Sequence, residues 1–492
     1  MKYILAIDQG TTGSRAIIYD RKGRVVASSY REFKQYFPKP GWVEHDPREI
    51  WASVDGSIQD VLLKVPPGSI TAIGITNQRE TTVLWDAQTS KPVHRAIVWQ
   101  CRRTAERCDH IRKSIGAAFF RERTGLPVDA YFSATKIEWI LRNVKGAREK
   151  ARLGKIRFGT TDTWVLWNLT GGKVHATDFT NASRTMLFNI NKKAWDGGIL
   201  KKLNIPRSIL PEVRTSSGVF GYTVKRGRLP AGIPVSGIAG DQQAALFGQA
   251  CFSPGSVKNT YGTGSFILMN VGKKKVRSEH GLILTLGCGR RGEPVYVLEG
   301  AVFVAGAAIQ WLRDGLRIIR NARETEKMAA GLKDNYGVYF VPALVGLGAP
   351  YWDQDARGAI YGITRGTTGA HIARAAIEAI CYQTRDVLDA MRKDSGIKIK
   401  ELKVDGGAAA NSFLCQFQAD ITGTKVVRPR IIETTSAGAA YLAGLAVGYW
   451  KNADEIRKFW REDRVFTPAM GKAKAGTLYK EWKGAVGRTL TK

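Results

Sequence analysis

A glycine- and hydroxyl-rich turn near the N-terminus has the composition of a phosphate-binding loop. The segment Asp8-Gln-Gly-Thr-Thr-Gly-Ser14 follows an apolar run and is followed by Arg15. Glycines let backbone N–H groups approach phosphate oxygens, and the threonine and serine hydroxyls add donors. Arg15 adds a cation, and Asp8 could reach Mg²⁺ through water, which this ion sheds reluctantly. A plain β-hairpin turn explains the same residues, so the turn alone leaves both interpretations open.

Two further glycine-rich segments could hold other parts of a nucleotide. Gly262-Thr-Gly-Ser265 offers a second set of phosphate donors, and Gly406-Gly-Ala408 allows close approach of an adenosine group. The chain has no GxxxxGK[ST] loop, dinucleotide fingerprint or protein-kinase catalytic loop. Any nucleotide must therefore be held in another way.

Strand-like and helical patterns alternate along the chain, which predicts an α/β fold. Short β-rich runs at 3–7, 16–19 and 25–28 predict a hairpin or meander, and 71–76 predicts another strand. Apolar residues at helical spacing predict helices over 50–65 and 372–391. A strand at 402–404 leads into the third glycine-rich segment, and a helix follows from about residue 411.

One pattern occurs twice. Residues 4–18 and 256–269 both read as a strand, a glycine-rich turn and a second strand. Two similar domains facing each other would explain this echo, and a coincidence of glycine-rich turns is the alternative. A length of 492 residues also favours two domains. The echo predicts a boundary near residue 248, with domains at 1–248 and 249–492.

Composition limits the classes of protein. With 44% hydrophobic and 24% charged residues the chain is typical of a soluble globular protein, and its six cysteines form no disulfide or zinc pattern. No signal peptide or 18-residue apolar span is present, so we expect a cytoplasmic protein without membrane insertion. The net charge of +32 could indicate nucleic-acid binding, but the basic residues are spread along the chain without a binding motif. Attraction of anionic ATP explains the excess equally well, and no specific nucleic-acid partner is expected.

Three sites in the order phosphate, phosphate, adenosine resemble those of the actin, hexokinase and Hsp70 ATPase fold. YFSATKIEWILRN at 131–143 and GAIYGITRGTTGAHIARAAIE at 358–378 resemble the two signatures of the FGGY carbohydrate kinases. Within that family, AIDQGTTGSR, ITNQRETTVLWD, AIVWQCRRT, TDFTNASRTMLFNI, GIAGDQQAALFGQ and NTYGTGSF resemble the members that act on glycerol. The resemblance implies two RNase-H-like domains that flank a catalytic cleft. It also implies transfer of the γ-phosphoryl group of ATP, with Mg²⁺, to glycerol, forming sn-glycerol 3-phosphate. A dimer or tetramer of identical chains would fit this family.

The same resemblance implies a role for particular residues. Asp241 would be the catalytic base and, with Asp8 acting through water, a contact of the metal. The substrate-binding residues would be Arg79, Glu80, Trp99, Tyr131, Asp241, Gln242 and Phe266. The ATP or ADP contacts would be Thr11, Thr12, Gly13, Arg15, Thr263, Gly306, Gln310, Gly407 and Asn411.

Residue types alone leave structural alternatives open. Asp241 could simply cap the helix that begins at Gln242. Arg79 and Glu80 could be a solvated pair at the end of a strand, and Trp99 and Phe266 could be core residues. A related kinase for a pentulose or gluconate, an actin-like or chaperone ATPase, and a nucleic-acid-binding protein are the alternative functions.

The chain also departs from patterns found in some family members. Residues 224–232 lack the Gly-Gly-Lys-Gly-Gly loop that binds a sugar bisphosphate inhibitor, and no histidine lies between His175 and His280 that could act as a phosphorylation switch. Position 13 is glycine where serine is common, although its backbone can still donate.

Overall fold

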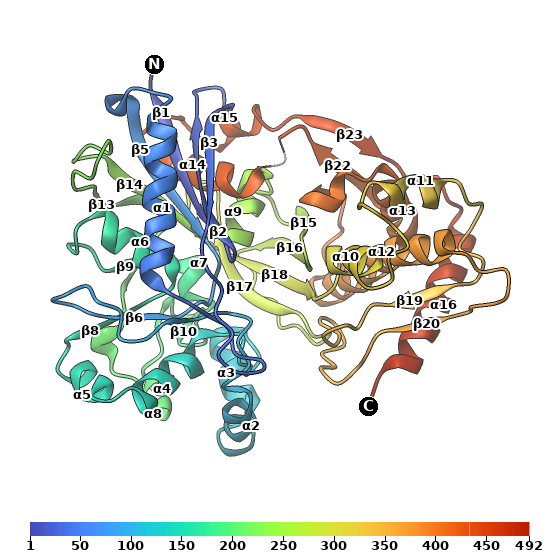
Figure 1. Ribbon diagram of the computed structural model, residues 1–492, viewed down its shortest axis with the longest axis horizontal. Coiled ribbons are helices and arrows are strands. Elements are labelled where there is room, and N and C mark those ends of the chain that lie inside the picture. Colours follow the sequence, from blue (N-terminus) through green and yellow to red (C-terminus); the bar gives the residue numbers. More distant parts are fainter. Residues whose placement is uncertain (432, 492) are drawn as a thin grey trace. The chain divides into compact units, whose positions relative to one another are not determined.

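The computed structural model describes residues 1–431 and 433–491, which form two compact units (Figure 1). Unit 1 consists of Met1–Phe252, Leu284–Tyr296 and Thr434–Phe459, and unit 2 of Ser253–Ile283, Val297–Glu433 and Trp460–Lys492. The single boundary near residue 248 stays a prediction, since the units are interleaved along the chain.

The sheet of unit 1 has the strand order β13-β14-β5-β1-β2-β3. Its strands are β1 (Tyr3–Gln9), β2 (Gly13–Tyr19), β3 (Val25–Glu32), β5 (Ile70–Asn77), β13 (Ser217–Tyr222) and β14 (Pro234–Gly240). β1, β2 and β3 form the predicted antiparallel meander, whereas β1, β5 and β14 run parallel. Residues of β1 are buried on both faces, as expected for a parallel strand covered on both sides.

Helix α1 (Pro47–Leu62) packs against β2 and β3 of unit 1 (Figure 1). It begins where the Asp46 side chain accepts the backbone N–H of Arg48, with proline at the first helical position. The sequence predicted a helix to residue 65, but it ends three residues earlier because Pro66 and Pro67 disfavour helical backbone before them.

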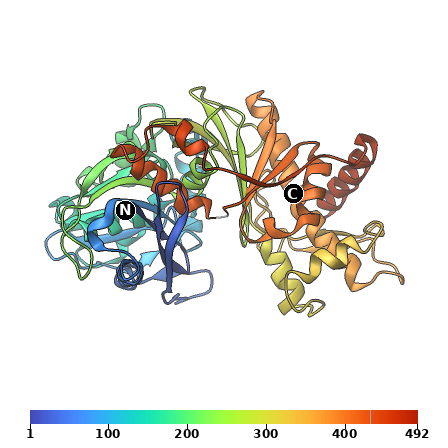
Figure 2. The same ribbon diagram turned by 90° about the horizontal axis from the view of Figure 1, so that it is seen from above.

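The C-terminal part of the chain returns to complete unit 1. Helices α14 (Thr434–Ala446) and α15 (Ala453–Arg457) lie among the blue and green elements of this unit in Figure 2. α14 packs against β1, β5, β14 and α9 (Asp241–Gly248). An added Cβ at Gly74 of β5 would overlap the carbonyl of Ala439, so glycine permits this close approach of helix and sheet.

Smaller elements surround this core of unit 1. Its other helices are α2 (Ala105–Ser114), α3 (Ala117–Thr124), α4 (Ser133–Asn143), α5 (Ala147–Arg152), α6 (Thr161–Leu169), α7 (Phe179–Ala182) and α8 (Gly197–Leu203). Its short strands are β4 (Glu44–His45), β6 (Val83–Asp86), β7 (Ala96–Ile97), β8 (Ile156–Gly159), β9 (Ala176–Asp178), β10 (Phe188–Asn189), β11 (Ala194–Trp195) and β12 (Glu212–Arg214). Two 3₁₀ turns are η1 (Pro67–Ser69) and η2 (Arg207–Ile209).

The second large sheet has the strand order β17-β18-β16-β15-β21-β22-β23. Its strands are β15 (Val257–Tyr261), β16 (Ser265–Gly272), β17 (Ile283–Cys288), β18 (Pro294–Val302), β21 (Glu401–Asp405), β22 (Lys425–Pro429) and β23 (Glu462–Phe466); the boundary between the units crosses β17 and β18. Unit 2 also contains β19 (Tyr339–Val341), β20 (Ala359–Tyr361), α10 (Gly306–Asp314), α11 (Glu324–Ala330), α12 (Gly369–Ser395), α13 (Ser412–Thr422), α16 (Lys472–Thr489) and η3 (Gly407–Ala410). α16, dark red in Figure 2, packs against α13 and β19.

The pattern shared by residues 4–18 and 256–269 belongs to a repeated arrangement of strands. The orders β3-β2-β1-β5-β14 and β18-β16-β15-β21-β22 correspond position by position, with β1 and β15 at the centre. In each case the central strand pairs antiparallel with the strand after its glycine-rich turn and parallel with a later strand. The similarity of the two turns therefore reflects two similar sheets.

Within the described residues, no helix is long and apolar enough to cross a membrane. All six cysteines are buried and free.

Candidate active site

The glycine-rich turn of unit 1 joins β1 to β2, and side chains around it hold its shape. The N–H of Gly10 donates to the carbonyl of Gly13 at 2.9 Å, which closes the turn. Thr11 accepts a hydrogen bond from Trp99 Nε1 at 3.0 Å, and the hydroxyls of Thr12 and Tyr30 lie 3.1 Å apart. Thr12 is exposed, while Thr11 and Arg15 are half-buried, so these side chains remain at the surface of the turn.

Gly13 is required by its neighbour in this chain. A Cβ at this position would lie 2.6 Å from the Tyr30 ring and 2.7 Å from the Arg31 carbonyl. The Tyr30 ring thus fills the space that a serine side chain would need. This contact gives the departure at position 13 a local structural reason.

Parallel pairing brings Asp8 and Asp241 to the same edge of the unit 1 sheet. Asp8 of β1 lies opposite Thr76 of β5, and Thr76 lies opposite Ala239 of β14, two residues before Asp241. Two strand spacings of 4.8 Å place β1 and β14 about 10 Å apart. Asp8 near the end of β1 and Asp241 directly after β14 therefore lie at the carboxyl ends of parallel strands, where ligands bind in open α/β sheets.

Arg79 connects two other residues of the predicted substrate site, Asp241 and Tyr131. Its Nε lies 3.2 Å from Asp241 Oδ1, and its Nη2 donates to the Tyr131 hydroxyl at 3.5 Å. Its Nη1 donates to Gln243 Oε1 at 3.3 Å. The Arg79 side chain is 2% exposed and that of Asp241 32% exposed. The guanidinium thus holds, from the protein side, a carboxylate that still faces solvent.

Glu80 is held in a strained backbone conformation beside Arg79. Its φ of 55° lies in the left-handed region, which side chains other than glycine rarely adopt. Arg184 Nε donates to Glu80 Oε1 at 2.6 Å, and Arg79 Nε lies 3.8 Å from the same oxygen. The Glu80 carbonyl accepts from Ser133 Oγ at 3.1 Å and from Lys136 Nζ at 3.5 Å. Burial lowers the pKa of Lys136 to about 8.

An aromatic edge borders this group. The rings of Trp99 and Tyr131 meet edge to face with centroids 5.6 Å apart. Trp99 also donates to Thr11, so one side chain joins the substrate residues to the glycine-rich turn. Trp99 and Tyr131 are both half-buried.

The geometry decides between several of the sequence alternatives. Arg79 and Glu80 are buried, so the solvated-pair interpretation is wrong. Gly240 is the N-cap residue of α9, and Asp241 stands in the first turn, where its Oδ1 accepts the N–H of Gln242 at 2.7 Å. Trp99 and Phe266 are only half-buried, so neither is a core residue.

In unit 2 the second glycine-rich turn is hydrogen-bonded to the start of α10. The N–H of Gly306 donates to the carbonyl of Gly262 at 3.0 Å, and the N–H groups of Ala305 and Ala307 donate to that of Thr263. An added Cβ at Gly306 would lie 2.6 Å from the Gly262 carbonyl oxygen, so only glycine fits there. Gln310 lies one helical turn beyond Gly306 and, like Thr263, is exposed.

The third glycine-rich segment lies at the same edge of the unit 2 sheet as the second glycine-rich turn. Thr260 of β15 pairs with Asp405 of β21, and η3, with Gly407, follows at once. Asn411 ends this segment, and its side chain caps α13 by accepting the N–H of Leu414 at 2.9 Å. The predicted nucleotide residues of unit 2 therefore form one group. Phe266, the second residue of β16, also lies in unit 2, whereas the other predicted substrate residues lie in unit 1.

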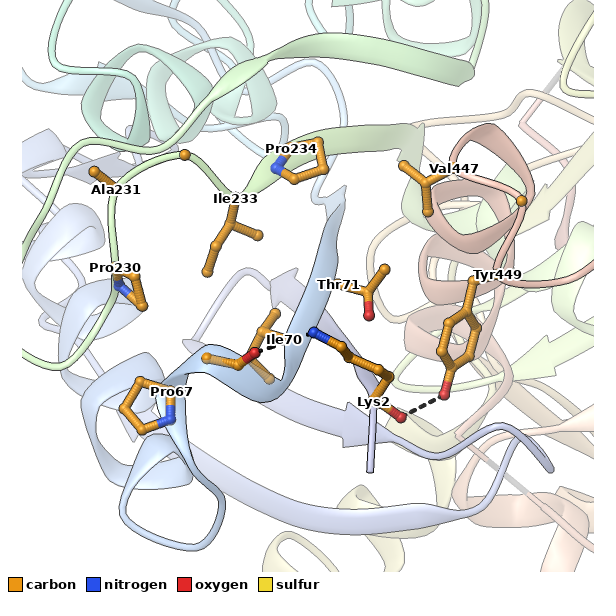
Figure 3. Close-up of a pocket in the computed structure, with 13 residues that line it drawn as sticks. Lys2, Pro67, Ile70, Thr71, Pro230, Ala231, Ile233, Pro234, Val447 and Tyr449 are labelled. Carbon is orange, nitrogen blue, oxygen red and sulfur yellow. Dashed lines mark hydrogen bonds between the residues drawn. The ribbon is translucent and has the colours of Figure 1, made fainter.

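A pocket of about 540 Å³ lies at the opposite edge of the unit 1 sheet (Figure 3). Lys2, Ile70 and Pro234, at the amino ends of β1, β5 and β14, line it together with Tyr449. The Tyr449 hydroxyl donates to the Lys2 carbonyl at 2.7 Å. This pocket contains none of the predicted site residues.

Sequence reasoning missed Arg184, Lys136 and Thr180. Thr180 Oγ1 accepts the N–H of Gly240 at 2.8 Å, directly before Asp241. Arg184 is the one cation in the segment TDFTNASRTMLFNI. That isolated charge was the available signal that Arg184 pairs with a buried carboxylate.

Two family models match the chain: the N-terminal domain of the FGGY family of carbohydrate kinases at residues 3–248, and its C-terminal domain at 257–447. The protein therefore belongs to the FGGY family of carbohydrate kinases, which confirms the resemblance seen in the sequence. The predicted α/β fold class, with two RNase-H-like domains, is confirmed as well.

Its close relatives are of one kind. The chain is 60% identical to glycerol kinase 2 of Thermotoga maritima, over 100% of this chain and 99% of the relative, and 60% identical to the glycerol kinase of Caldanaerobacter subterraneus, over 99% of each. The structure matches the crystal structure of Plasmodium falciparum glycerol kinase with ADP at a TM-score of 0.94 and 39% identity, covering 100% and 99% of the two chains. A gluconate kinase from Lactobacillus acidophilus shares only the fold, at 23% identity and a TM-score of 0.88.

Proposed function

We propose that this protein transfers the γ-phosphoryl group of ATP to glycerol and forms sn-glycerol 3-phosphate. The observation that carries the proposal is the identity of 59–60% with glycerol kinases along essentially the whole chain. The buried Arg79 bridge between Asp241 and Tyr131 supports it independently, because it supplies the polar groups that a small polyol needs.

Asp241 is proposed as the base for the attacking hydroxyl. Its Oδ1 is occupied by Arg79 and the N–H of Gln242, while Oδ2 accepts only the Gln242 side chain among the contacts described, at 3.2 Å. A carboxylate oxygen has two lone pairs, so Oδ2 can still accept a substrate hydroxyl proton. In a loose phosphoryl-transfer transition state the proton leaves late, and a weak base in the correct position suffices.

The remaining predicted residues form two groups, one that would bind the phosphoryl acceptor glycerol and one that would bind the nucleotide. Arg79, Tyr131 and Gln242 would donate to glycerol oxygens and Glu80 would accept from its hydroxyls, with Trp99 and Phe266 as the apolar boundary. The turn with Thr11, Thr12, Gly13 and Arg15 would bind phosphate. Thr263, Gly306, Gln310, Gly407 and Asn411 would bind the ADP moiety.

Mg²⁺ fits the carboxyl edge of unit 1. Residues 1–431 and 433–491 contain no group of three or more acidic, histidine or cysteine side chains that could cage a metal. In kinases, however, Mg²⁺ is usually held by one or two carboxylates, water and the phosphates themselves, and Asp8 and Asp241 provide two. When bound, the ion would neutralise charge on the phosphate oxygens. A cytoplasmic location and a homo-oligomer stay predictions.

The test is an ADP-release assay with glycerol, 1,2-propanediol and xylulose, with and without a chelator. Glycerol should give the highest kcat/KM, and removal of Mg²⁺ should abolish turnover reversibly. A site built to bind a hydroxyl rejects an analogue that lacks it by up to about 10⁴-fold. Turnover of xylulose equal to that of glycerol would instead identify a sugar kinase. Strong ATP hydrolysis without any polyol would favour an actin-like or chaperone ATPase.

A further inference from the structure

We infer that Arg184 is a positioning residue for the acceptor: it holds Glu80 and Tyr131 in the arrangement that recognises the glycerol hydroxyls. The inference deepens the proposed function and rests on it. It concerns a side chain to which neither the sequence motifs nor the comparisons assign a role.

The contacts of Arg184 join two residues of the predicted substrate site. Its Nε donates to Glu80 Oε1 at 2.6 Å, and its guanidinium carbon lies 5.6 Å from the centre of the Tyr131 ring. The same group lies 5.4 Å from the Phe132 ring. Arginine stacks on aromatic rings while it binds a carboxylate, and lysine cannot reproduce both contacts.

Arg184 is buried beneath the residues that would contact the substrate. Its side chain has no exposed surface, whereas Tyr131 is half-buried and Asp241 is 32% exposed. It therefore acts on the substrate through Glu80 and Tyr131. A buried cation of this kind is costly unless it is paired, and its partner here is the strained Glu80.

The pairing sets what Glu80 can recognise. As an ion-paired carboxylate Glu80 only accepts hydrogen bonds, so it selects hydroxyl donors on the substrate. Arg184 occupies Oε1, which directs the remaining acceptor capacity of Glu80 away from itself. Without Arg184 the carboxylate would turn toward Arg79, whose Nε is already 3.8 Å away. Arg79 would then hold Asp241 less well.

The segment that carries Arg184 supports the catalytic turn as well. Thr180, four residues earlier, accepts the N–H of Gly240 next to Asp241, and Thr185 accepts the N–H of Ala134 near Tyr131. Residues 180–185 therefore contact the Glu80 side chain and the backbone close to Asp241 and Tyr131, which are three of the predicted glycerol-binding residues. Arg184 is the charged member of that segment.

The experiment compares Arg184→Gln and Arg184→Lys with the wild type. For Arg184→Gln the KM for glycerol should rise about 10- to 100-fold, the effect of losing a hydrogen bond between charged groups, with the KM for ATP nearly unchanged. Arg184→Lys keeps the charge and should lie between the two. Adding Arg184→Gln to Glu80→Gln should cause little further loss, because the two residues act as one unit.

Arg107→Gln is the matched control. Arg107 makes two hydrogen bonds of 2.8 Å to Glu138 in the same unit, and the described contacts of this pair include none of the predicted site residues. Its loss therefore removes an ion pair, although a more exposed one, from the same unit. This variant should lower the melting temperature without changing the KM for glycerol.

An unchanged glycerol KM in folded Arg184→Gln would overturn the inference. Equal rises in the KM for glycerol and the KM for ATP, of the size found in the control variant, would overturn it as well. If Arg184→Gln does not fold, a wild-type glycerol KM in Arg184→Lys overturns it and a raised one supports it. A wild type that does not phosphorylate glycerol at all would instead refute the proposed function.

Discussion

Asp241 is both held and available. Arg79 and the N–H of Gln242 fix one of its oxygens, and its place in the first turn of α9 favours a negative charge. Its partial exposure leaves the second oxygen open to a substrate. This combination is what a base needs when its position matters more than its strength.

The Asp241→Asn variant keeps the shape of the side chain and removes the proton acceptor. We expect kcat for glycerol to fall by roughly 10²–10⁴ while nucleotide binding is nearly intact. The measurement is steady-state turnover combined with calorimetric titration of an ATP analogue. Wild-type turnover in the purified variant would contradict the role of base.

The predicted site residues came from the family resemblance, and residue types alone did not predict their environment. On type and position alone, Arg79 and Glu80 suit an exposed strand end, yet the structure buries both. Their burial depends on Arg184 and Lys136, which lie far along the chain and compensate the charge and the backbone carbonyl of Glu80. Local spacing carries no information on such distant partners.

At the scale of elements, the start of α6 contains a buried acid. Asp162 accepts hydrogen bonds from Thr160 and Thr177, and Asn77 at the end of β5 lies 3.4 Å from it. Burial raises the pKa of Asp162 to about 6. The folded protein therefore holds a proton that the unfolded chain releases near pH 4.

This difference predicts a pH dependence for Asp162→Asn. The contribution of Asp162 to stability is greatest below pH 4 and is lost as the pH rises to about 6, because only the folded state still binds the proton. The melting temperature of the variant relative to wild type should rise over that interval and stay level above it. The free-energy change is on the order of 3 kcal/mol, at about 1.4 kcal/mol per pH unit. A constant difference from pH 4 to 7 would show that Asp162 is not protonated.

The packing of α14 on α9 makes a second element critical. A Cβ added at Gly438 would overlap the carbonyl of Ala244 in α9, the helix that begins with Asp241. Gly438→Ala should destabilise the fold by about 1–3 kcal/mol through overpacking, and it should lower kcat as α9 shifts. Differential scanning calorimetry and turnover measure the two effects.

Gly484→Ala is the control for this substitution. Gly484 lies in α16 with open space around it, so alanine should be neutral or stabilise by up to about 1 kcal/mol. Equal effects of the two substitutions would mean that the contact between α14 and α9 is not tight.

At the scale of the whole molecule, each unit is built from stretches that lie far apart in the sequence. Helix α14 is rich in Gly and Ala and is buried along most of its length. Its sequence position placed it with the C-terminal domain, but α14 packs against the sheet of unit 1. Periodicity reveals that a helix is buried, and only tertiary contacts reveal which sheet buries it.

This interleaving predicts how fragments behave. Residues 1–252 alone lack the helix that covers β1, β5 and β14 beside the apolar cluster of unit 1, and they should aggregate or fail to unfold cooperatively. Joining 434–459 to that fragment through a flexible Gly/Ser linker should recover soluble protein with a cooperative thermal transition. A fusion to 460–485 has an insert of equal length taken from unit 2, so it controls for length and linker. Size-exclusion chromatography and circular dichroism would compare the three chains. Cooperative folding of residues 1–252 alone, or equal recovery with either insert, would show that α14 is not needed to complete unit 1.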